Sequence, residues 1–173
     1  FSERAPDLSG FEVALSGFFS SFHLYEHQGF KSEHTTKVEE VLAFLEITHL
    51  RNKRISEMST GELRKCIIAR ALVHNPKAMI LDEPTVGLDI KAQLGFVQLL
   101  RKIAQERTII LVTHHLEEIF EEINHVVLIK QGSIYAQGPK EEFLNDAHLS
   151  HVFDIPLRVQ CEKGRYFVQS IGD

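Results

Sequence analysis

Residues 58–65 read MSTGELRK and residues 78–85 read AMILDEPT, and these two stretches decide which fold the sequence predicts. In the first stretch, Ser59 and Glu62 have the S-x-x-E spacing of a capping box, in which each side chain accepts a hydrogen bond from the other residue's backbone N–H. A helix that starts here exposes free N–H groups, and Gly61 in its first turn leaves room for another molecule beside the backbone. The stretch therefore predicts either a helix start that binds an anion such as phosphate or simply a well-capped helix.

The second stretch is a short apolar run that ends in two acids. Such a run between prolines is typical of a parallel strand buried on both faces. Asp82 and Glu83 end it, at the edge where open α/β sheets bind ligands. Because successive strand residues point to opposite faces, we expect the carboxylates to diverge, one to hold a hard cation such as Mg²⁺ and the other to polarise a water. The alternative is a solvated turn in which an acid caps the next element.

A second strand follows after one helix. Asp89 is a good N-cap for an amphipathic helix, and residues 108–112 read TIILV before Thr113-His114-His115. Strand, helix and strand over roughly thirty residues predict a right-handed unit with parallel strands. If the strands are neighbours, His114 lies beside Asp82 and Glu83. A histidine that merely caps a strand end at the surface is the alternative.

Periodicity and turn residues predict the remaining elements. We expect helices over residues 12–25, around 38–45, over 116–123 and from 139 to 144, a hairpin over 125–136, and a small hairpin within 149–173 that turns near Gly164.

Composition narrows the class of protein. The 173 residues are 43% hydrophobic and 25% charged, which fits one full globular domain or a large piece of a bigger one. The sequence contains no run of ~18 apolar residues, so it predicts no membrane-spanning helix. The formal charge of −5 and the absence of clustered Lys and Arg argue against a nucleic-acid partner. Cys66 and Cys161 have no metal-ligand spacing, and this predicts no disulfide framework and a reducing, cytoplasmic location.

Four motifs together resemble those of one family, the ATP-binding cassette (ABC) ATPases. Residues 58–62 resemble the Leu-Ser-Gly-Gly-Gln signature, and residues 78–83 look like the Walker B strand with its catalytic Glu. Residues 87–89, GLD, are similar to the D-loop, and Thr113-His114 to the switch-histidine loop. The flanks agree, since residues 8–57 resemble the helical subdomain of the family.

This resemblance implies an α/β fold. It would contain an incomplete P-loop NTPase-like parallel sheet core, an α-helical signature subdomain and a C-terminal β-hairpin. The implied division is a helical signature subdomain over 1–75, an ATPase core over 76–145 and a C-terminal extension over 146–173.

The resemblance also implies ATP hydrolysis with ATP and Mg²⁺ as cofactors. Asp82 would organise Mg²⁺ through its water shell, Glu83 would polarise the attacking water, and His114 would contact the γ-phosphate. These are the positioning and charge-neutralising groups that phosphoryl transfer needs.

The signature would serve a second cassette in a head-to-tail homodimer or heterodimer. Ser59 and Gly61 would bind the γ-phosphate of ATP held by that cassette, with Glu62 beside them, and Asp89 would couple the two sites. The cassette would power solute transport by a transmembrane permease, at the inner face of the cell membrane.

The sequence departs from the family pattern in two ways. Met58, Thr60 and Glu62 stand where Leu, Gly and Gln are usual, a variant similar to some metal- and molybdenum-linked transport ATPases, and Glu62 is tolerable near phosphate only if the capping box turns it back on the helix. No glycine of the chain is followed by Lys, so the P-loop motif is missing. We therefore expect the C-terminal portion of a longer cassette, which alone does not bind ATP tightly.

Three other hypotheses stay open at this point. The chain could be a cassette-derived binding module without hydrolysis, or an ABC-like ATPase not linked to transport, although residues 1–57 lack the sustained heptads of chromosome-organising ATPases. It could also be an unrelated metal hydrolase that uses Asp82, Glu83 and His114, which leaves the signature helix without a role.

Overall fold

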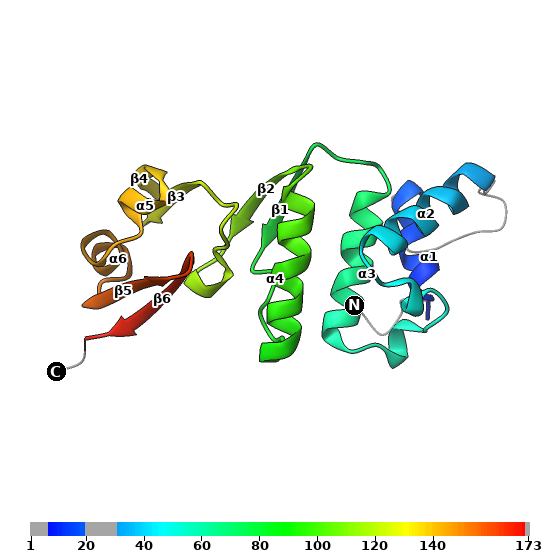
Figure 1. Ribbon diagram of the computed structural model, residues 1–173, viewed down its shortest axis with the longest axis horizontal. Helices are drawn as coiled ribbons and strands as arrows, with labels where there is room; N and C mark the ends of the chain where they lie inside the picture. The colour runs from blue at the N-terminus through cyan, green and yellow to red at the C-terminus, as the bar shows by residue number, and fades with distance from the viewer. Residues whose placement is uncertain (1–6, 20–30, 172–173) are drawn as a thin grey trace. The chain divides into compact units, whose positions relative to one another are not determined.

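A computed structural model of the chain describes residues 7–19 and 31–171 (Figure 1). The chain divides into two compact units, Phe1–Met79 with Thr85–Leu99, and Ile80–Pro84 with Leu100–Asp173. The boundary between them falls within one strand and within one helix. The division into a signature subdomain, an ATPase core and a C-terminal extension stays a prediction.

Helices dominate the first unit. They are α1 (Gly10–Leu15), η1 (Ser16–Phe19), α2 (Ser32–Phe44), η3 (Thr48–Leu50), η4 (Ile55–Glu57) and α3 (Thr60–Leu72), where η denotes a 3₁₀ turn. Helix α1 packs against both α2 and α3. The apolar stripe predicted around residues 38–45 forms part of the core, since Val38, Val41, Leu42 and Leu45 are all buried.

The helix predicted over residues 12–25 is shorter than expected. It begins at Gly10, capped by Ser9 and Glu12, and its α-helical part ends at Leu15. A 3₁₀ turn follows, in which the hydroxyl of Ser16 donates to the carbonyl of Val13 at 2.6 Å. The last part of the predicted helix, residues 20–25, lies outside the described residues. The spacing of apolar residues alone did not predict this change from an α-helix to a 3₁₀ turn.

Helix α4 (Ile90–Ala104) connects strands β1 (Ala78–Asp82) and β2 (Thr108–Val112), which are hydrogen-bonded neighbours. Beyond the end of β1, the N–H of Glu83 donates to the carbonyl of Val112, the last residue of β2, at 2.8 Å. The carboxyl ends of both strands therefore meet at one edge, as the predicted strand, helix and strand unit requires.

One expectation about β1 is wrong. The strand is not buried on both faces, because Ile80 is 71% exposed and Met79 is its one buried residue. On β2, Ile110 and Val112 are 47% and 48% exposed. Within the part of the chain that the structure describes, β1 and β2 form a sheet of two strands, so their apolar side chains lack a covering layer there.

The second unit ends in two hairpins and two short helices. After η5 (Leu116–Glu118) come β3 (His125–Lys130), β4 (Ser133–Pro139), α5 (Lys140–Phe143), α6 (Asp146–Phe153), β5 (Leu157–Glu162) and β6 (Arg165–Ser170). The pairs β3–β4 and β5–β6 are both antiparallel, and Gly164 lies in the second turn at a φ of 74°. Both predicted hairpins are thus confirmed.

The helix predicted over residues 116–123 is wrong, because a single 3₁₀ turn stands there. The N–H of Ile119 donates to the carbonyl of Leu116, three residues back, and the chain is extended at Ile119. Leu116 and Phe120 are nevertheless buried. The apolar spacing therefore predicted the burial of these residues correctly, but the helix that it also predicted does not form.

A core of six buried side chains holds the second unit together. They are Leu116, Leu128, Leu144, Leu149, Leu157 and Tyr166, from η5, both hairpins and the segments between them. Among the described residues, no helix has both the length and the apolar character that a membrane crossing needs.

Candidate functional site

The start of α3 carries the predicted capping box. Ser59 is the N-cap, and its hydroxyl accepts from the N–H of Glu62 at 3.3 Å. The carboxylate of Glu62 accepts in return from the N–H of Ser59 at 2.8 Å. Glu62 is therefore turned back onto its own helix, the orientation that an acidic residue needs beside a phosphate.

Lys53 neutralises Glu62, a contact that the sequence did not predict. Its ammonium group donates to both carboxylate oxygens of Glu62, at 2.9 and 2.8 Å. This hydrogen bond, followed by that from the N–H of Ser59, lowers the pKa of Glu62 against a smaller opposing effect of burial. The signature start thus carries a paired carboxylate. The one signal in the sequence was a basic residue in the charged link before the signature.

Gly61 is buried against its own chain. A Cβ at this position would lie 3.3 Å from the Cβ of Ala92 and 3.8 Å from a methyl group of Leu88. In the next turn, the guanidinium of Arg64 donates to the carbonyl of Val86 at 2.6 Å. The signature helix therefore packs against the segment that resembles the D-loop, and a side chain at residue 61 would require Ala92 to shift by a few tenths of an ångström. A role of Gly61 in phosphate binding stays a prediction.

Asp89 caps α4 as predicted. One oxygen of its carboxylate accepts from the N–H of Ala92 at 2.8 Å, and its carbonyl accepts from the N–H of Gln93. Asp89 is exposed, in the same unit as Ser59, Gly61 and Glu62.

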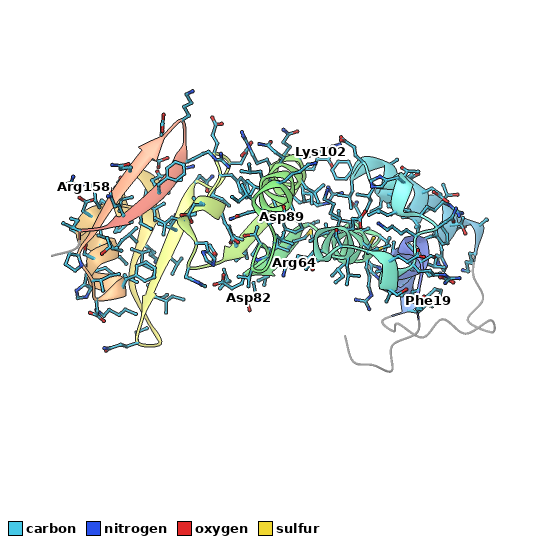
Figure 2. The ribbon with its side chains drawn as sticks, turned by 90° about the horizontal axis from the view of Figure 1, so that it is seen from below. Phe19, Arg64, Asp82, Asp89, Lys102 and Arg158 are labelled. Atoms are coloured by element: carbon cyan, nitrogen blue, oxygen red, sulfur yellow. The ribbon has the colours of Figure 1, made fainter. Side chains whose placement is uncertain are left out.

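The two acids at the end of β1 have different environments. Asp82 is the last residue of the strand and is exposed (Figure 2). Glu83 is partly buried, and its φ of 45° places it in the left-handed region, which residues other than glycine seldom adopt. The backbone therefore turns at Glu83, and its carboxylate reaches toward the residues that follow β2.

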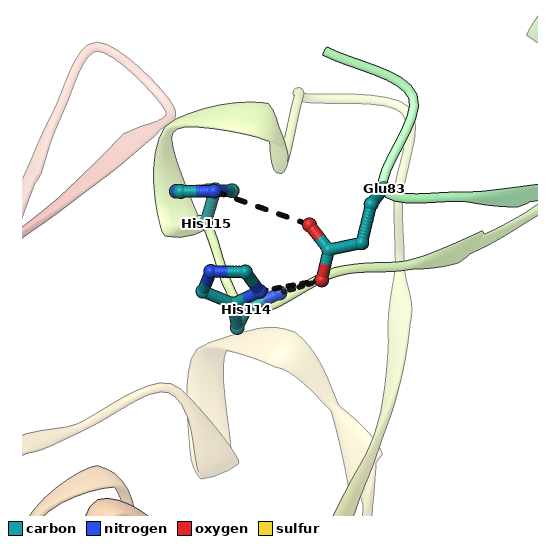
Figure 3. A group of neighbouring side chains, drawn as sticks. All are labelled: Glu83, His114 and His115. Carbon is teal, nitrogen blue, oxygen red and sulfur yellow. Dashed lines mark hydrogen bonds and ion pairs between the residues drawn. The ribbon is translucent and has the colours of Figure 1, made fainter. Parts of the chain in front are cut away.

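Glu83 and His114 are brought into direct contact, as the strand order predicts. Nδ1 of His114 lies 2.5 Å from Oε1 of Glu83, and the N–H of His114 donates to the same oxygen at 3.1 Å (Figure 3). The other carboxylate oxygen lies 3.5 Å from the hydroxyl of Thr113 and 3.9 Å from Nε2 of His115. Glu83, His114 and His115 form what we call the carboxylate–histidine cluster.

These contacts hold Glu83 in its charged form. Partial burial acts to raise its pKa, but the hydrogen bond and charge of His114, its backbone N–H and the charge of His115 together lower the pKa below the usual value. At neutral pH the cluster therefore presents a carboxylate with two imidazoles on the same side.

His115 is the second residue of the site that the sequence did not predict. Its N–H donates to the hydroxyl of Thr113 at 2.9 Å, and its ring centroid lies 4.0 Å from that of His114. The only signal was its place next to His114. Alternation along a strand predicts that neighbouring side chains diverge, and that rule fails here because β2 has already ended at Val112.

The residues present fit Mg²⁺ in one respect. The exposed carboxylate of Asp82, at the sheet edge, offers the hard oxygen donors that Mg²⁺ prefers and leaves room for the waters that the ion retains.

Comparisons with known proteins agree with the motifs. Residues 6–86 match the ABC transporter family. The ABC transporter ATP-binding protein YlmA of Bacillus subtilis is 37% identical over 166 residues, which cover 94% of this chain and 62% of YlmA. The zinc uptake system ATP-binding protein ZurA of Listeria monocytogenes is 35% identical over 156 residues, 89% of this chain and 58% of ZurA. The chain thus spans less than two thirds of the length of both relatives.

Solved structures share the fold. An ABC transporter in an inward-facing conformation matches with a TM-score of 0.81 at 24% identity, over 99% of this chain and 68% of that one. CbiO1 of Clostridium perfringens, part of the ABC transporter complex CbiONQ, matches with a TM-score of 0.66 at 28% identity, over 86% of this chain and 57% of CbiO1.

Proposed function

Because the chain belongs to the family of ABC transporter ATP-binding proteins, we propose that it takes part in ATP binding and hydrolysis that powers solute transport. It would supply the signature, the catalytic carboxylate and the switch histidine of a cassette. Membership of this family also removes the reason to treat the chain as an unrelated metal hydrolase.

The observation that supports this proposal most is the contact between Glu83 and His114. It joins a carboxylate that follows β1 to an imidazole that follows β2, at the sheet edge where α/β proteins bind ligands. A buried structural ion pair would not need this location or this exposure, since the side chain of His114 is 62% exposed.

We assign Glu83 to polarise the water that attacks the γ-phosphate. Its lowered pKa keeps it ionised at neutral pH. Among the described residues, Oε2 has only the long contact with Thr113 and the 3.9 Å approach of His115, so it retains capacity to accept from a water. His114 would hold this carboxylate in place and donate to the γ-phosphate. Asp82 would hold Mg²⁺ through its water shell, and the ion would neutralise phosphate charge when bound.

The signature would act on a nucleotide held by a second cassette. The N-terminus of α3 presents backbone N–H groups and a positive dipole end, which favour a phosphate. The Lys53 ammonium supports this role because it pairs Glu62, the one acid in the first turn. Ser59 and Gly61 would approach the phosphate, and Asp89 would couple the two sites. We place the assembled cassettes beside a transmembrane permease on the inner face of the membrane.

Replacing Glu83 by glutamine in the cassette that contains this chain tests the proposal. Glu83→Gln removes the charge and keeps the shape, so ATP binding should persist while turnover falls by a factor of ~100 or more, within the range of rate lost when a general base is removed. Turnover is measured by phosphate release, and binding by equilibrium titration with ATP.

Glu141→Gln is the matched control, because Glu141 is an exposed glutamate of α5 outside the cluster. It should leave both binding and turnover unchanged. Unchanged turnover in Glu83→Gln would overturn the assignment of the base.

A further inference from the structure

The carboxylate–histidine cluster has the composition of a transition-metal site. One ligand atom each from Glu83, His114 and His115 lies within 4.8 Å of the other two. Two imidazole nitrogens and one carboxylate are the donors of many zinc sites and of sites with open positions for other first-row metals. The hydrolysis proposed above uses Glu83, His114 and Asp82 and gives no role to His115.

We propose that Glu83, His114 and His115 bind a first-row transition-metal ion of the Zn²⁺ class. All three residues belong to the second unit of the chain. The site is distinct in chemistry from the Mg²⁺ position proposed at Asp82, because imidazole nitrogens favour Zn²⁺ and its neighbours over hard cations.

The geometry needs only small side-chain movements to accept such an ion. With metal–ligand bonds of ~2.0–2.1 Å in a tetrahedral arrangement, ligand atoms lie about 3.4 Å apart. The pair His114 Nδ1 and Glu83 Oε1, now 2.5 Å apart, would open to admit the ion. Nε2 of His115, now 3.9 Å from the other carboxylate oxygen, Oε2, would move toward the ion as the third ligand.

The local framework already orients the three ligands. The N–H of His114 donates to Glu83, and the N–H of His115 donates to the Thr113 hydroxyl, which itself contacts Glu83. Figure 3 shows both imidazole rings on the same side of the carboxylate. Hydrogen bonds from neighbouring groups orient the side chains that bind a metal ion.

The cluster is also accessible. The side chains of Glu83, His114 and His115 are 31%, 62% and 41% exposed, so an ion can enter and can keep water in its remaining positions. If the proposed function is correct, a bound ion would occupy the carboxylate and the imidazole that hydrolysis needs, and it would compete with turnover.

Titration of the chain with Co²⁺, without nucleotide, tests the proposal. Co²⁺ replaces Zn²⁺ with the same ligands and reports tetrahedral nitrogen and oxygen coordination through its visible absorption. We expect one Co²⁺ per chain, displaced by Zn²⁺ but not by excess Mg²⁺. His115→Ala should weaken binding at least about tenfold, because the loss of even an outer-shell partner weakens metal sites by ~10–100-fold.

His125→Ala is the matched control, since His125 is an exposed histidine at the start of β3 in the same unit. It should bind Co²⁺ like the unaltered chain, and circular dichroism checks that both variants are folded. Absence of Co²⁺ absorption, or binding that is unchanged in His115→Ala, would overturn the metal site. Because no ATP is present, either result is independent of whether Glu83 acts in hydrolysis.

Discussion

Cys66 and Cys161 are residues of one type in different surroundings. Cys66 lies in α3 with none of its surface exposed, and burial, with the nearby charge of Glu62, raises the pKa of its thiol to about 11. Cys161 is an exposed residue of β5. Both are free thiols.

The two thiols should therefore react with disulfide reagents at very different rates. At pH 8 we expect one fast thiol, Cys161, and one that reacts only when the chain unfolds, because the thiolate is the reactive form. Absorbance of the released chromophore measures both phases. Cys161→Ser should abolish the fast phase alone, and a fast phase that survives this change would contradict the assignment.

The residues of the site that could be predicted are those whose partners are close in sequence or follow from strand order. Ser59 and Glu62 are three apart, and the contact of Glu83 with His114 follows from neighbouring parallel strands. Lys53 and His115 could not be predicted, because their roles depend on how a link folds back and on where a strand ends. A charged link and a second histidine are common features that specify neither contact.

Gly17 and Gly95 both lie in helical elements, but only Gly17 is packed closely against other residues. A Cβ on Gly17, in η1, would clash with the carbonyl of Arg70 and approach a methyl group of Val73. A Cβ on Gly95, in the middle of α4, would meet nothing within 4 Å. The first glycine permits close packing, whereas the second only weakens its helix.

Alanine at the two positions should therefore change stability in opposite directions. Gly17→Ala should lower the free energy of unfolding by ~1–3 kcal/mol, the usual effect of overpacking. Gly95→Ala should raise it by ~0.5–1 kcal/mol, because alanine restricts the unfolded chain and favours the helix. Urea titrations of the two variants measure both values, and each serves as the other's control. A stabilising Gly17→Ala would show that the packing against α3 is looser than described.

Element prediction succeeded where local signals and tertiary packing agree. The capping box, strands β1 and β2 and both hairpins carry their own start and stop residues. It failed at residues 16–19 and 116–118, where the backbone forms 3₁₀ turns instead of an α-helix. The apolar spacing still predicted the burial of Leu116 and Phe120 correctly. The exposure of Ile80 could not be predicted either, because it depends on what covers the sheet and not on the sequence of the strand.

At the scale of the whole molecule, three carboxylates in the two units link stability to pH. The pKa values of Glu62, Glu83 and Asp154 are all lowered, and the largest lowering contributions come from Lys53, His114 and Lys130 respectively. Because the folded pKa lies below the unfolded one, each group stabilises the fold above its unfolded pKa. That stability is lost as the pH falls through the folded pKa.

We therefore expect the free energy of unfolding to be level near neutrality and to fall as the pH drops below the ordinary pKa values of 4.5 for glutamate and 3.8 for aspartate. Urea titrations between pH 7 and pH 3 measure this. Lys53→Met keeps the aliphatic stem and removes one partner, so the pH dependence should become shallower. Lys91→Met, at an exposed position of α4, is the control. An identical slope in the two variants would contradict the role of Lys53.

The left-handed backbone of Glu83 sets two demands on a single position. Folding alone would favour glycine there, since a residue with a Cβ is less stable in this conformation by ~1–2 kcal/mol. The role in ATP hydrolysis that we propose for Glu83 requires a carboxylate, which glycine cannot supply. Variants selected only for thermal stability would therefore lose glutamate at residue 83, and under the proposed function the same change would abolish ATP hydrolysis.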